Sequence, residues 1–451
     1  MESLQAAAKG SSLVICVLDA ARVDHFGVYG YPRPTTPSFD RLADDSLLFD
    51  QHFAEAPQTR TSTISLFTGQ YPDTHQALAI WESGERRRAR GATPFTLEKA
   101  LQGAGFRTFI SSSNPLASPQ SGVGSDFMAW PHAMDSGVRE GWRPDTFISH
   151  AMSGEIGRLQ SRPGSRLFAY LHVLPPHQPY RAPGDIARLF AGERPPTYWQ
   201  GEFEFPEAAA GCMTESPPDS WVAWGNSYDA NLRWADSAVG ALVDRLRASG
   251  QLEKTLLIIT ADHGEALREH GYGFHAGVPY DEALHIPLLI RFPGGKGPHG
   301  RVKALTQTID LLPTLLDLYG VPYPHDQVQG RTMLPLLTGR ASKVNDTVVS
   351  LATPCYIVRD VHSTLVLFPG GRQQALYDMD RDPWQTRNIA ATQPARVKAL
   401  VHAFEEYARR QKRPPIGFLS PSYRPPKRLD GPADKLSDET RRQLRALGYL
   451  K

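Results

Sequence analysis

Short, continuously apolar runs alternate along the chain with longer segments whose apolar residues recur at helical spacing. Runs of this length and composition are typical of strands that are buried on both faces of a sheet. Strands are predicted at residues 13–18, 48–53, 106–110, 167–171, 255–260 and 285–292. Helices are predicted at residues 95–102, 145–159, 224–248 and 309–319. This alternation predicts an α/β fold with a large, mostly parallel central sheet flanked by helices.

From about residue 345 the pattern changes to short strand-like pieces joined by turns. These pieces lie at residues 347–351, 356–359, 364–368 and 375–379, and a helix is predicted at 395–410. We therefore expect a large domain at 1–344 and a small antiparallel β subdomain with a helix at 345–412. The remaining residues, 413–451, read as a Pro-rich linker followed by a docking helix.

Composition narrows the class of protein. The chain has 451 residues, of which 41% are hydrophobic and 21% charged, as in an ordinary soluble protein. A formal charge of +2 predicts no special attraction to nucleic acid. Three cysteines, one of them in the first predicted strand, favour a reducing compartment.

The chain shows neither a signal-peptide layout at its start nor an apolar run long enough to span a membrane. We therefore expect a cytoplasmic protein, although a chain from which a leader or anchor had been removed would show the same pattern. The oligomeric state is left open by the sequence.

Polar side chains of metal-ligand type follow two of the predicted strands. Asp19 comes directly after the run at 13–18, and Asp262 and His263 follow the run at 255–260. Because carboxyl ends of parallel strands meet at one edge of a sheet, these residues are expected to share a rim. Two carboxylates and an imidazole suit a divalent cation such as Zn, Mn, Mg or Ca. For either aspartate alone, capping of a neighbouring helix is the alternative.

Thr59 lies in the loop before a short predicted helix that ends at Gly69. Thr61 or Ser62 is expected to cap that helix, which would place Thr59 in front of a helix N-terminus, where an anion is favoured. An unassisted threonine is a poor nucleophile, so a cation or a base must activate it. The natural target is a tetrahedral anion such as a phosphoryl group, and a plain structural role is the alternative.

Three histidines lie on segments that leave strands at the predicted rim. His172 and His177 follow the run at 167–171, and His275 lies twelve residues after His263. We assign His177 and His275 to binding of phosphoryl oxygens and protonation of the leaving group. Glu265 is expected to support a metal-ligating histidine. A second group, His25, His270 and His285, is kept as structural.

Several motifs in this order resemble the sulfatase family of the alkaline phosphatase superfamily. The matching stretches are residues 18–25, 29–31, 36–37, 56–72, 176–180, 260–265, 286–288, 310–314, 330–331, and 376–378 with 382–383. The resemblance implies an alkaline-phosphatase-like sandwich. In sulfatases the position of Thr59 carries a Cys or Ser that is converted to formylglycine, and an Arg of the same motif falls on Thr63. The segment that supplies a Lys and a His to sulfate binding aligns with residues 112–115, which lack both.

These departures make the chain similar to the threonine-nucleophile branch of the superfamily, which includes phosphoethanolamine and phosphoglycerol transferases and phosphoester hydrolases. By resemblance, the metal ligands are Asp19, Thr59, Asp262 and His263. The catalytic residues are Thr59, His177 and His275, and the substrate-binding residues are His172, Asn114 and Arg60. Ala20 stands where sulfatases often have a second carboxylate, which keeps zinc and manganese in view.

The sequence therefore predicts a metal-dependent phosphoester hydrolase or phosphotransferase that uses Thr59 as a covalent nucleophile on a small anionic ester. Phosphate monoesters, phosphate diesters and phosphonate esters remain open as substrates. The alternatives are a sulfatase, a lipid-headgroup transferase and an inactive binding homologue. Loops at 81–93, 117–143 and 181–220 are expected to form the walls of the substrate pocket.

Overall fold

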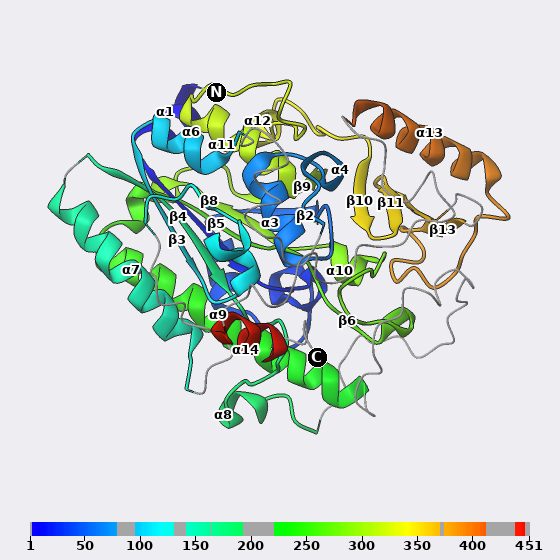
Figure 1. The fold of residues 1–451 in the computed structure, drawn as a ribbon, viewed down its shortest axis with the longest axis horizontal. Coiled ribbons are helices and arrows are strands. Elements are labelled where there is room, and N and C mark those ends of the chain that lie inside the picture. The colour runs from blue at the N-terminus through cyan, green and yellow to red at the C-terminus, as the bar shows by residue number, and fades with distance from the viewer. Residues whose placement is uncertain are drawn as a thin grey trace.

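The structure is a computed structural model that describes residues 2–78, 95–129, 141–162, 164–192, 221–369, 374–411 and 438–446. In it a large central sheet is flanked by helices, and a smaller sheet lies beside it, covered by a C-terminal helix (Figure 1). Most of the three loops expected to wall the pocket lies outside the described residues.

Among the described residues, the central sheet has seven strands in the order β3-β4-β1-β5-β8-β2-β9. Their bounds are β1 Ser12–Leu18, β2 Leu47–Phe53, β3 Phe106–Ser112, β4 Arg166–Val173, β5 Thr255–Ala261, β8 Leu288–Arg291 and β9 Gly300–Gln307. β1 pairs in parallel with β4 and β5, and only β8 runs against its neighbours β5 and β2. The expected α/β fold with a mostly parallel central sheet is confirmed.

β9 is the strand that the sequence pattern does not predict. Its first four residues are exposed or half-buried, and within the sheet it pairs with β2 alone, at the edge. An edge strand needs no continuous apolar run, because one side faces no partner strand. The continuous apolar run that reveals the central strands is therefore absent from β9.

Both faces of the sheet are covered by helices, which explains why its central strands are apolar throughout. On one face lie α2 (Pro37–Ala43), α7 (Pro144–Ser161) and α9 (Trp221–Ala248), and on the other α3 (Thr59–Thr68), α6 (Leu97–Gly103) and α11 (Leu311–Tyr319). Successive side chains of β1 enter opposite cores, as the period of a strand requires.

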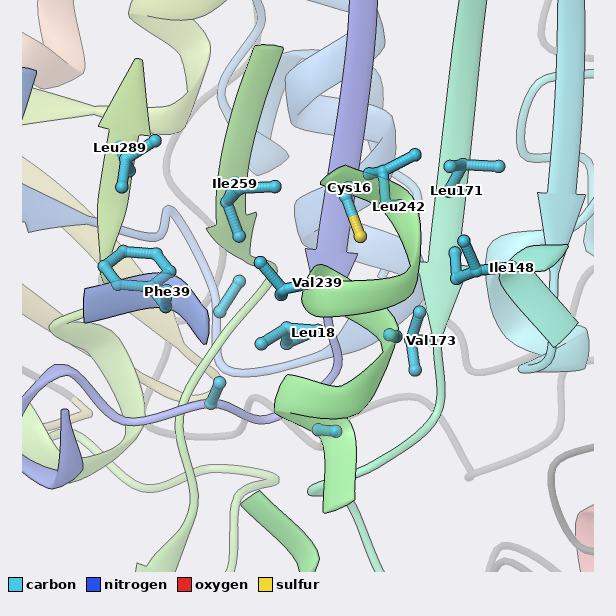
Figure 2. Packing of buried hydrophobic residues seen from close by; sticks show 14 of the residues in the cluster. Cys16, Leu18, Phe39, Ile148, Leu171, Val173, Val239, Leu242, Ile259 and Leu289 are labelled. Atoms are coloured by element: carbon cyan, nitrogen blue, oxygen red, sulfur yellow. The ribbon is translucent and has the colours of Figure 1, made fainter. Parts of the chain in front are cut away.

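Figure 2 shows the core under α9, where Val239 and Leu242 of the helix face Cys16, Leu18 and Ile259 of the sheet. All five side chains are buried. This buried apolar contact fixes the rotation of α9 about its axis, because turning the helix would expose apolar surface. The polar residues that α9 directs toward the ends of the strands are fixed with it.

The smaller sheet is an antiparallel arrangement of β10 (Val348–Ala352), β11 (Cys355–Arg359), β12 (Ser363–Leu367) and β13 (Gln374–Asp378). α13 (Pro394–Arg410) packs on it through Leu400, Phe404 and Tyr407. The expected small antiparallel sheet with a helix is confirmed. A last helix, α14 (Asp438–Ala446), contacts the 3₁₀ turn Pro115–Ala117, and residues 413–437, where the linker was expected, lie outside the described residues.

In the part of the chain that the structure describes, no helix has the length and apolar composition needed to cross a bilayer.

The carboxyl ends of β1, β2, β3, β4 and β5 point to the same edge of the sheet, since these strands run in one direction. The residues that follow them there are Asp19 after β1, Thr59 after β2, Asn114 after β3, His177 after β4 and Asp262 after β5. Ligands bind at this edge in open α/β sheets. The topology therefore assembles the candidate site from five separate stretches of sequence.

Candidate active site

Three buried side chains at this edge form a cluster with metal-ligand chemistry. Ligand atoms of Asp19, Asp262 and His263 all lie within 4.8 Å of one another. Nε2 of His263 is 3.6 Å from Oδ1 of Asp19 and 3.5 Å from Oδ2 of Asp262. Within the described residues, these two carboxylate oxygens are buried and accept no hydrogen bond. Buried polar atoms are rarely left unsatisfied, so this pair indicates a position for a cation.

The other atoms of the three side chains are held by the protein. Oδ1 of Asp262 accepts hydrogen bonds from the backbone N–H groups of Ala20 and His263, at 3.1 and 3.0 Å. Nδ1 of His263 is 2.8 Å from the carbonyl oxygen of Gly264, to which it donates, so its Nε2 carries the lone pair. One donor atom of each residue is thereby directed to the common centre. The residues fit a divalent cation, and sites of this type are supported by such outer contacts.

Burial acts differently on the two carboxylates. For Asp19, burial raises the pKa, but the charge of His177 and the hydrogen bond from His172 outweigh it, and the pKa falls well below its ordinary value. For Asp262, burial and then the negative charge of Asp19 raise the pKa. The mutual repulsion of the two carboxylates is the electrostatic cost that a bound cation relieves.

Thr59 joins the cluster directly. Its Oγ1 is 3.1 Å from Nε2 of His263, and its side chain is buried. Thr59 is also the first residue of α3, where backbone N–H groups lack partners within the helix and attract negative charge. The hydroxyl therefore lies between the candidate cation position and a helix N-terminus.

The expected capping of α3 by Thr61 or Ser62 is wrong. The helix begins at Thr59, Gln58 occupies the N-cap position, and no side-chain hydrogen bond caps it. The Thr61 hydroxyl donates to the carbonyl oxygen of Ala77, and the Ser62 hydroxyl donates to that of Asp262. The Ser62 hydroxyl therefore ties α3 to the end of β5, where the candidate metal ligands Asp262 and His263 lie.

The two histidines assigned to the phosphoryl group lie beside the cluster. The ring centroids of His275 and His263 are 4.2 Å apart, and those of His275 and His177 are 4.9 Å apart. Nδ1 of His275 is 3.0 Å from Oε1 of Glu265. Glu265 was expected to support a metal-ligating histidine, but the structure pairs it with His275 instead. All four residues are buried.

His172 and Asn114 both contact Asp19. Nε2 of His172 is 3.0 Å from Oδ2 of Asp19, and its Nδ1 is 2.9 Å from the Tyr170 hydroxyl. The Asn114 amide donates to the same carboxylate oxygen, while its Oδ1 accepts from the backbone N–H of Leu116. Both side chains have no exposed surface. The geometry makes them supports of Asp19, and contact with a substrate stays a prediction for both.

Arg60 occupies the first turn of α3, where its Nε donates to the carbonyl oxygen of Ser121 at 3.0 Å. Its assignment to substrate binding also stays a prediction. The histidines kept as structural are buried or half-buried and hydrogen-bonded away from the cluster. Their partners are Asp229 for His25, Glu282 for His270 and the carbonyl oxygen of Asp50 for His285.

Tyr170 and Ser62 contact candidate site residues, and sequence reasoning missed both of them. Tyr170 lies two residues before His172 on β4, so the strand period places both on one face, and that signal was available. Ser62 gave no such signal, because its partner Asp262 lies 200 residues away in the chain.

The described residues form a mostly parallel α/β sheet with a buried polar cluster at its carboxyl edge, and the architecture is alkaline-phosphatase-like. The family model described as Sulfatase matches residues 11–321. The chain therefore belongs to the sulfatase family, which confirms the resemblance found in its motifs. A second model, described as N-sulphoglucosamine sulphohydrolase, C-terminal, matches residues 268–411.

Similar proteins carry both sulfatase and phosphonate hydrolase names. An arylsulfatase of Clostridium perfringens (strain 13 / Type A) is 22% identical over 440 residues, covering 84% of this chain and 90% of that protein. Human arylsulfatase A is 28% identical over 363 residues, covering 74% of this chain and 69% of that protein. The crystal structure of a phosphonate monoester hydrolase of Agrobacterium radiobacter superimposes with a TM-score of 0.73 at 21% identity, covering 88% of this chain and 95% of that one. That structural likeness supports the fold.

Proposed function

We propose that the protein is a metal-dependent hydrolase or transferase of phosphate esters that uses Thr59 as its covalent nucleophile. The observation that carries the proposal is the position of Thr59 Oγ1, 3.1 Å from Nε2 of His263. A threonine whose role was only to cap a helix would have no need of a metal-ligand cluster beside its hydroxyl.

The cluster and the helix N-terminus serve the same oxygen. When bound at Asp19, Asp262 and His263, a divalent cation supplies positive charge that favours an ionised hydroxyl and offsets negative charge on the ester. Backbone N–H groups in the first turn of α3 are suited to hold phosphoryl oxygens. Thr59 is thereby activated by the charge of the cation, and the N-terminus of α3 holds the phosphoryl group that Thr59 attacks.

In the first half-reaction the Thr59 hydroxyl proton passes to solvent and Oγ1 bonds to phosphorus as the bond to the ester oxygen breaks. The departing oxygen takes a proton from His275 or His177, both of which lie beside the cluster. In the second, water or an acceptor alcohol gives a proton to that histidine and bonds to phosphorus, and Thr59 departs as the ionised oxygen, which takes a proton back from solvent. Hydrolysis and transfer differ only in this acceptor.

Sulfate ester hydrolysis is the second candidate, and the names of the relatives favour it. The arylsulfatase of Clostridium perfringens and human arylsulfatase A both match over most of the chain. Against it, the resemblance places Thr59 where sulfatases carry the Cys or Ser that becomes formylglycine. A threonine hydroxyl is a direct nucleophile and suits phosphoryl transfer.

The deciding experiment compares 4-nitrophenyl phosphate, bis(4-nitrophenyl) phosphate, 4-nitrophenyl phenylphosphonate and 4-nitrophenyl sulfate as substrates of the wild type, Thr59→Ala and Thr68→Ala. Thr68 is a matched control, because it is buried on the same helix and its hydroxyl bonds locally to the carbonyl oxygen of Ile64. We expect phosphorus esters to be preferred, and Thr59→Ala to lose about a thousandfold or more in kcat. A phosphoryl adduct on the peptide 59–69, seen by mass spectrometry after acid quench, would support the covalent step. Preference for the sulfate ester would overturn the proposed substrate class. Near-normal turnover by Thr59→Ala would overturn the role of Thr59 as covalent nucleophile.

A further inference from the structure

We propose that Asn231, on the buried side of α9, is a positioning residue that sets the place of both His177 and His275. This inference rests on the proposed function, because it concerns the two histidines assigned there to leaving-group protonation. Asn231 has no exposed surface, although asparagine is seldom fully buried unless its amide is satisfied. Its contacts show what the amide does.

The Asn231 side chain gathers the backbone of the segment that carries His177. Its Oδ1 accepts from the N–H groups of Arg181 and Ala182, at 2.9 Å each. Its NH₂ group makes longer contacts, of 3.4 to 3.5 Å, with the carbonyl oxygens of Pro176, His177 and Pro179. Only a side chain that both accepts and donates can serve this segment from one position.

The other side of the same segment is attached to the metal site. The backbone N–H of His177 donates to the carbonyl oxygen of Asp19 at 3.0 Å. The backbone of His177 is therefore held between the backbone of Asp19, directly after β1, and the side chain of Asn231 on α9. Loss of the Asn231 contacts would release one of these two attachments and leave the metal ligands themselves unaltered.

The segment also reaches His275. The hydroxyl of Tyr180 donates to Oε2 of Glu265 at 3.2 Å, and Oε1 of Glu265 is 3.0 Å from Nδ1 of His275. Tyr180 lies directly before the two residues whose N–H groups bond to Asn231. One amide therefore acts on His177 through the backbone and on His275 through Tyr180 and Glu265.

The register of α9 supports this reading. Tyr228, three residues before Asn231, accepts from the N–H of Arg22 and donates to the carbonyl oxygen of Ala20, in the turn after Asp19. Residues three apart lie on one face of a helix. The same face of α9 thus holds the turn after β1 and the segment after β4, and the apolar contacts of Val239 and Leu242 fix the rotation of that face (Figure 2).

A positioning role predicts a specific kinetic signature. Phenyl phosphate needs protonation of its leaving group, because phenolate is a poor leaving group. 2,4-Dinitrophenyl phosphate hardly needs it, because its phenolate is a good leaving group. Displacing a proton donor by about 1 Å can cost about 100-fold in rate. Asn231→Leu should therefore lose about 100-fold in kcat on the phenyl ester and only a few-fold on the dinitrophenyl ester, with unchanged metal content.

The matched control is Asn226→Leu. Asn226 also lies on α9, and its Oδ1 accepts from Nη1 of Arg33 at 2.8 Å. Arg33, however, does not lie on a segment that carries one of the candidate site residues. The Asn226→Leu variant should show no difference between the two esters. Equal losses of Asn231→Leu on both esters, or no loss on either, would overturn the proposal. If the leucine variant does not fold, Asn231→Ser takes its place with the same criteria.

Hydrogen exchange tests the positioning without any turnover. The Arg181 and Ala182 amides should exchange faster in Asn231→Leu than in the wild type, while Asn231→Asp, which keeps the acceptor oxygens, should retain their protection. Unchanged exchange in Asn231→Leu would contradict the role. Should the wild type cleave no ester, the proposed function fails while this measurement still decides whether Asn231 holds the segment.

Discussion

The hydroxyl oxygen of Thr59 lies 3.1 Å from Nε2 of His263, although 204 residues separate them in the chain. The two residues follow β2 and β5, which run in the same direction and are separated in the sheet by β8. Their carboxyl ends therefore meet at one edge. This contact joins a nucleophile candidate to a metal-ligand candidate.

Replacing Asp262 by asparagine should reduce metal binding and activity together. Its Oδ2 is one of the two carboxylate oxygens of the cluster that are buried and accept no hydrogen bond from the described residues, and an amide in its place offers a weaker ligand and no charge. We expect a loss larger than the 10- to 100-fold that removal of an outer support typically costs. Plasma mass spectrometry measures the loss of bound metal. Asp310→Asn is the control, because Asp310 is buried outside the cluster.

Removal of the metal tests the same site in the wild type. A bound cation stabilises the folded state by mass action, so chelation should lower both Tm and activity. Restoration by Zn, Mn, Mg or Ca, added singly, identifies the preferred ion. A chelated enzyme that keeps its full activity and Tm would contradict the assignment of Asp19, Asp262 and His263.

Tyr170→Phe should weaken metal binding by about 10- to 100-fold while leaving every ligand in place. The Tyr170 hydroxyl is 2.9 Å from Nδ1 of His172, whose Nε2 is 3.0 Å from Asp19, so its loss frees the imidazole to rotate. Tyr319→Phe is the control, because that buried hydroxyl donates to the carbonyl oxygen of Ser12 at the opposite end of β1. After chelation, metal titration should show a lower metal affinity for Tyr170→Phe than for Tyr319→Phe. Equal affinities would count against the role of Tyr170 in supporting His172.

Glu55 should make stability decrease as pH rises. Burial raises the pKa of its carboxyl from the ordinary 4.5 to about 8, so the native chain holds this proton at pH values where the unfolded chain has lost it. The stabilisation is fully present below about pH 4.5 and is lost as pH rises toward 8, at up to about 1.4 kcal/mol per pH unit.

Urea unfolding of the wild type and Glu55→Gln at several pH values from 5 to 8 measures the difference that this one group makes. The glutamine variant should gain stability relative to the wild type as pH rises through the window. Glu405→Gln, at an exposed site on α13, should show no such trend. A constant difference between wild type and Glu55→Gln would mean that the native carboxyl is not protonated.

Asp73 should anchor the smaller sheet and its helix to the turn after α3. This buried carboxylate accepts from the hydroxyl of Tyr356 on β11 at 2.7 Å and from that of Tyr407 on α13 at 2.6 Å. A hydrogen bond to a charged group contributes about 1.5 to 3 kcal/mol. Tyr356→Phe and Tyr407→Phe should each lower the free energy of unfolding by about that amount, and Asp73→Ala by more, because two buried hydroxyls lose their acceptor. Denaturant unfolding checks the order of the three variants.

Much of the fold was predictable because its central strands are buried on both faces and therefore continuously apolar. β1, β3, β4 and β5 were predicted to within about three residues of their ends, and so were the strands of the smaller sheet. β9 was not, since an edge strand carries no such run. The start of α3 was also misplaced, because the hydroxyls of Thr61 and Ser62 bond to Ala77 and Asp262 and not to the helix end.

The sequence by itself determined which side chains can carry the chemistry: it placed Asp19, Asp262 and His263 at the ends of apolar strands, and parallel strands bring such ends together. Tertiary structure alone decided which neighbour each polar group serves. Glu265 supports His275, Asn114 and His172 hold Asp19, and Asn231 gathers the segment of His177. These pairings depend on the packed rotation of helices and on contacts between residues far apart in the chain, for which local pattern carries no information.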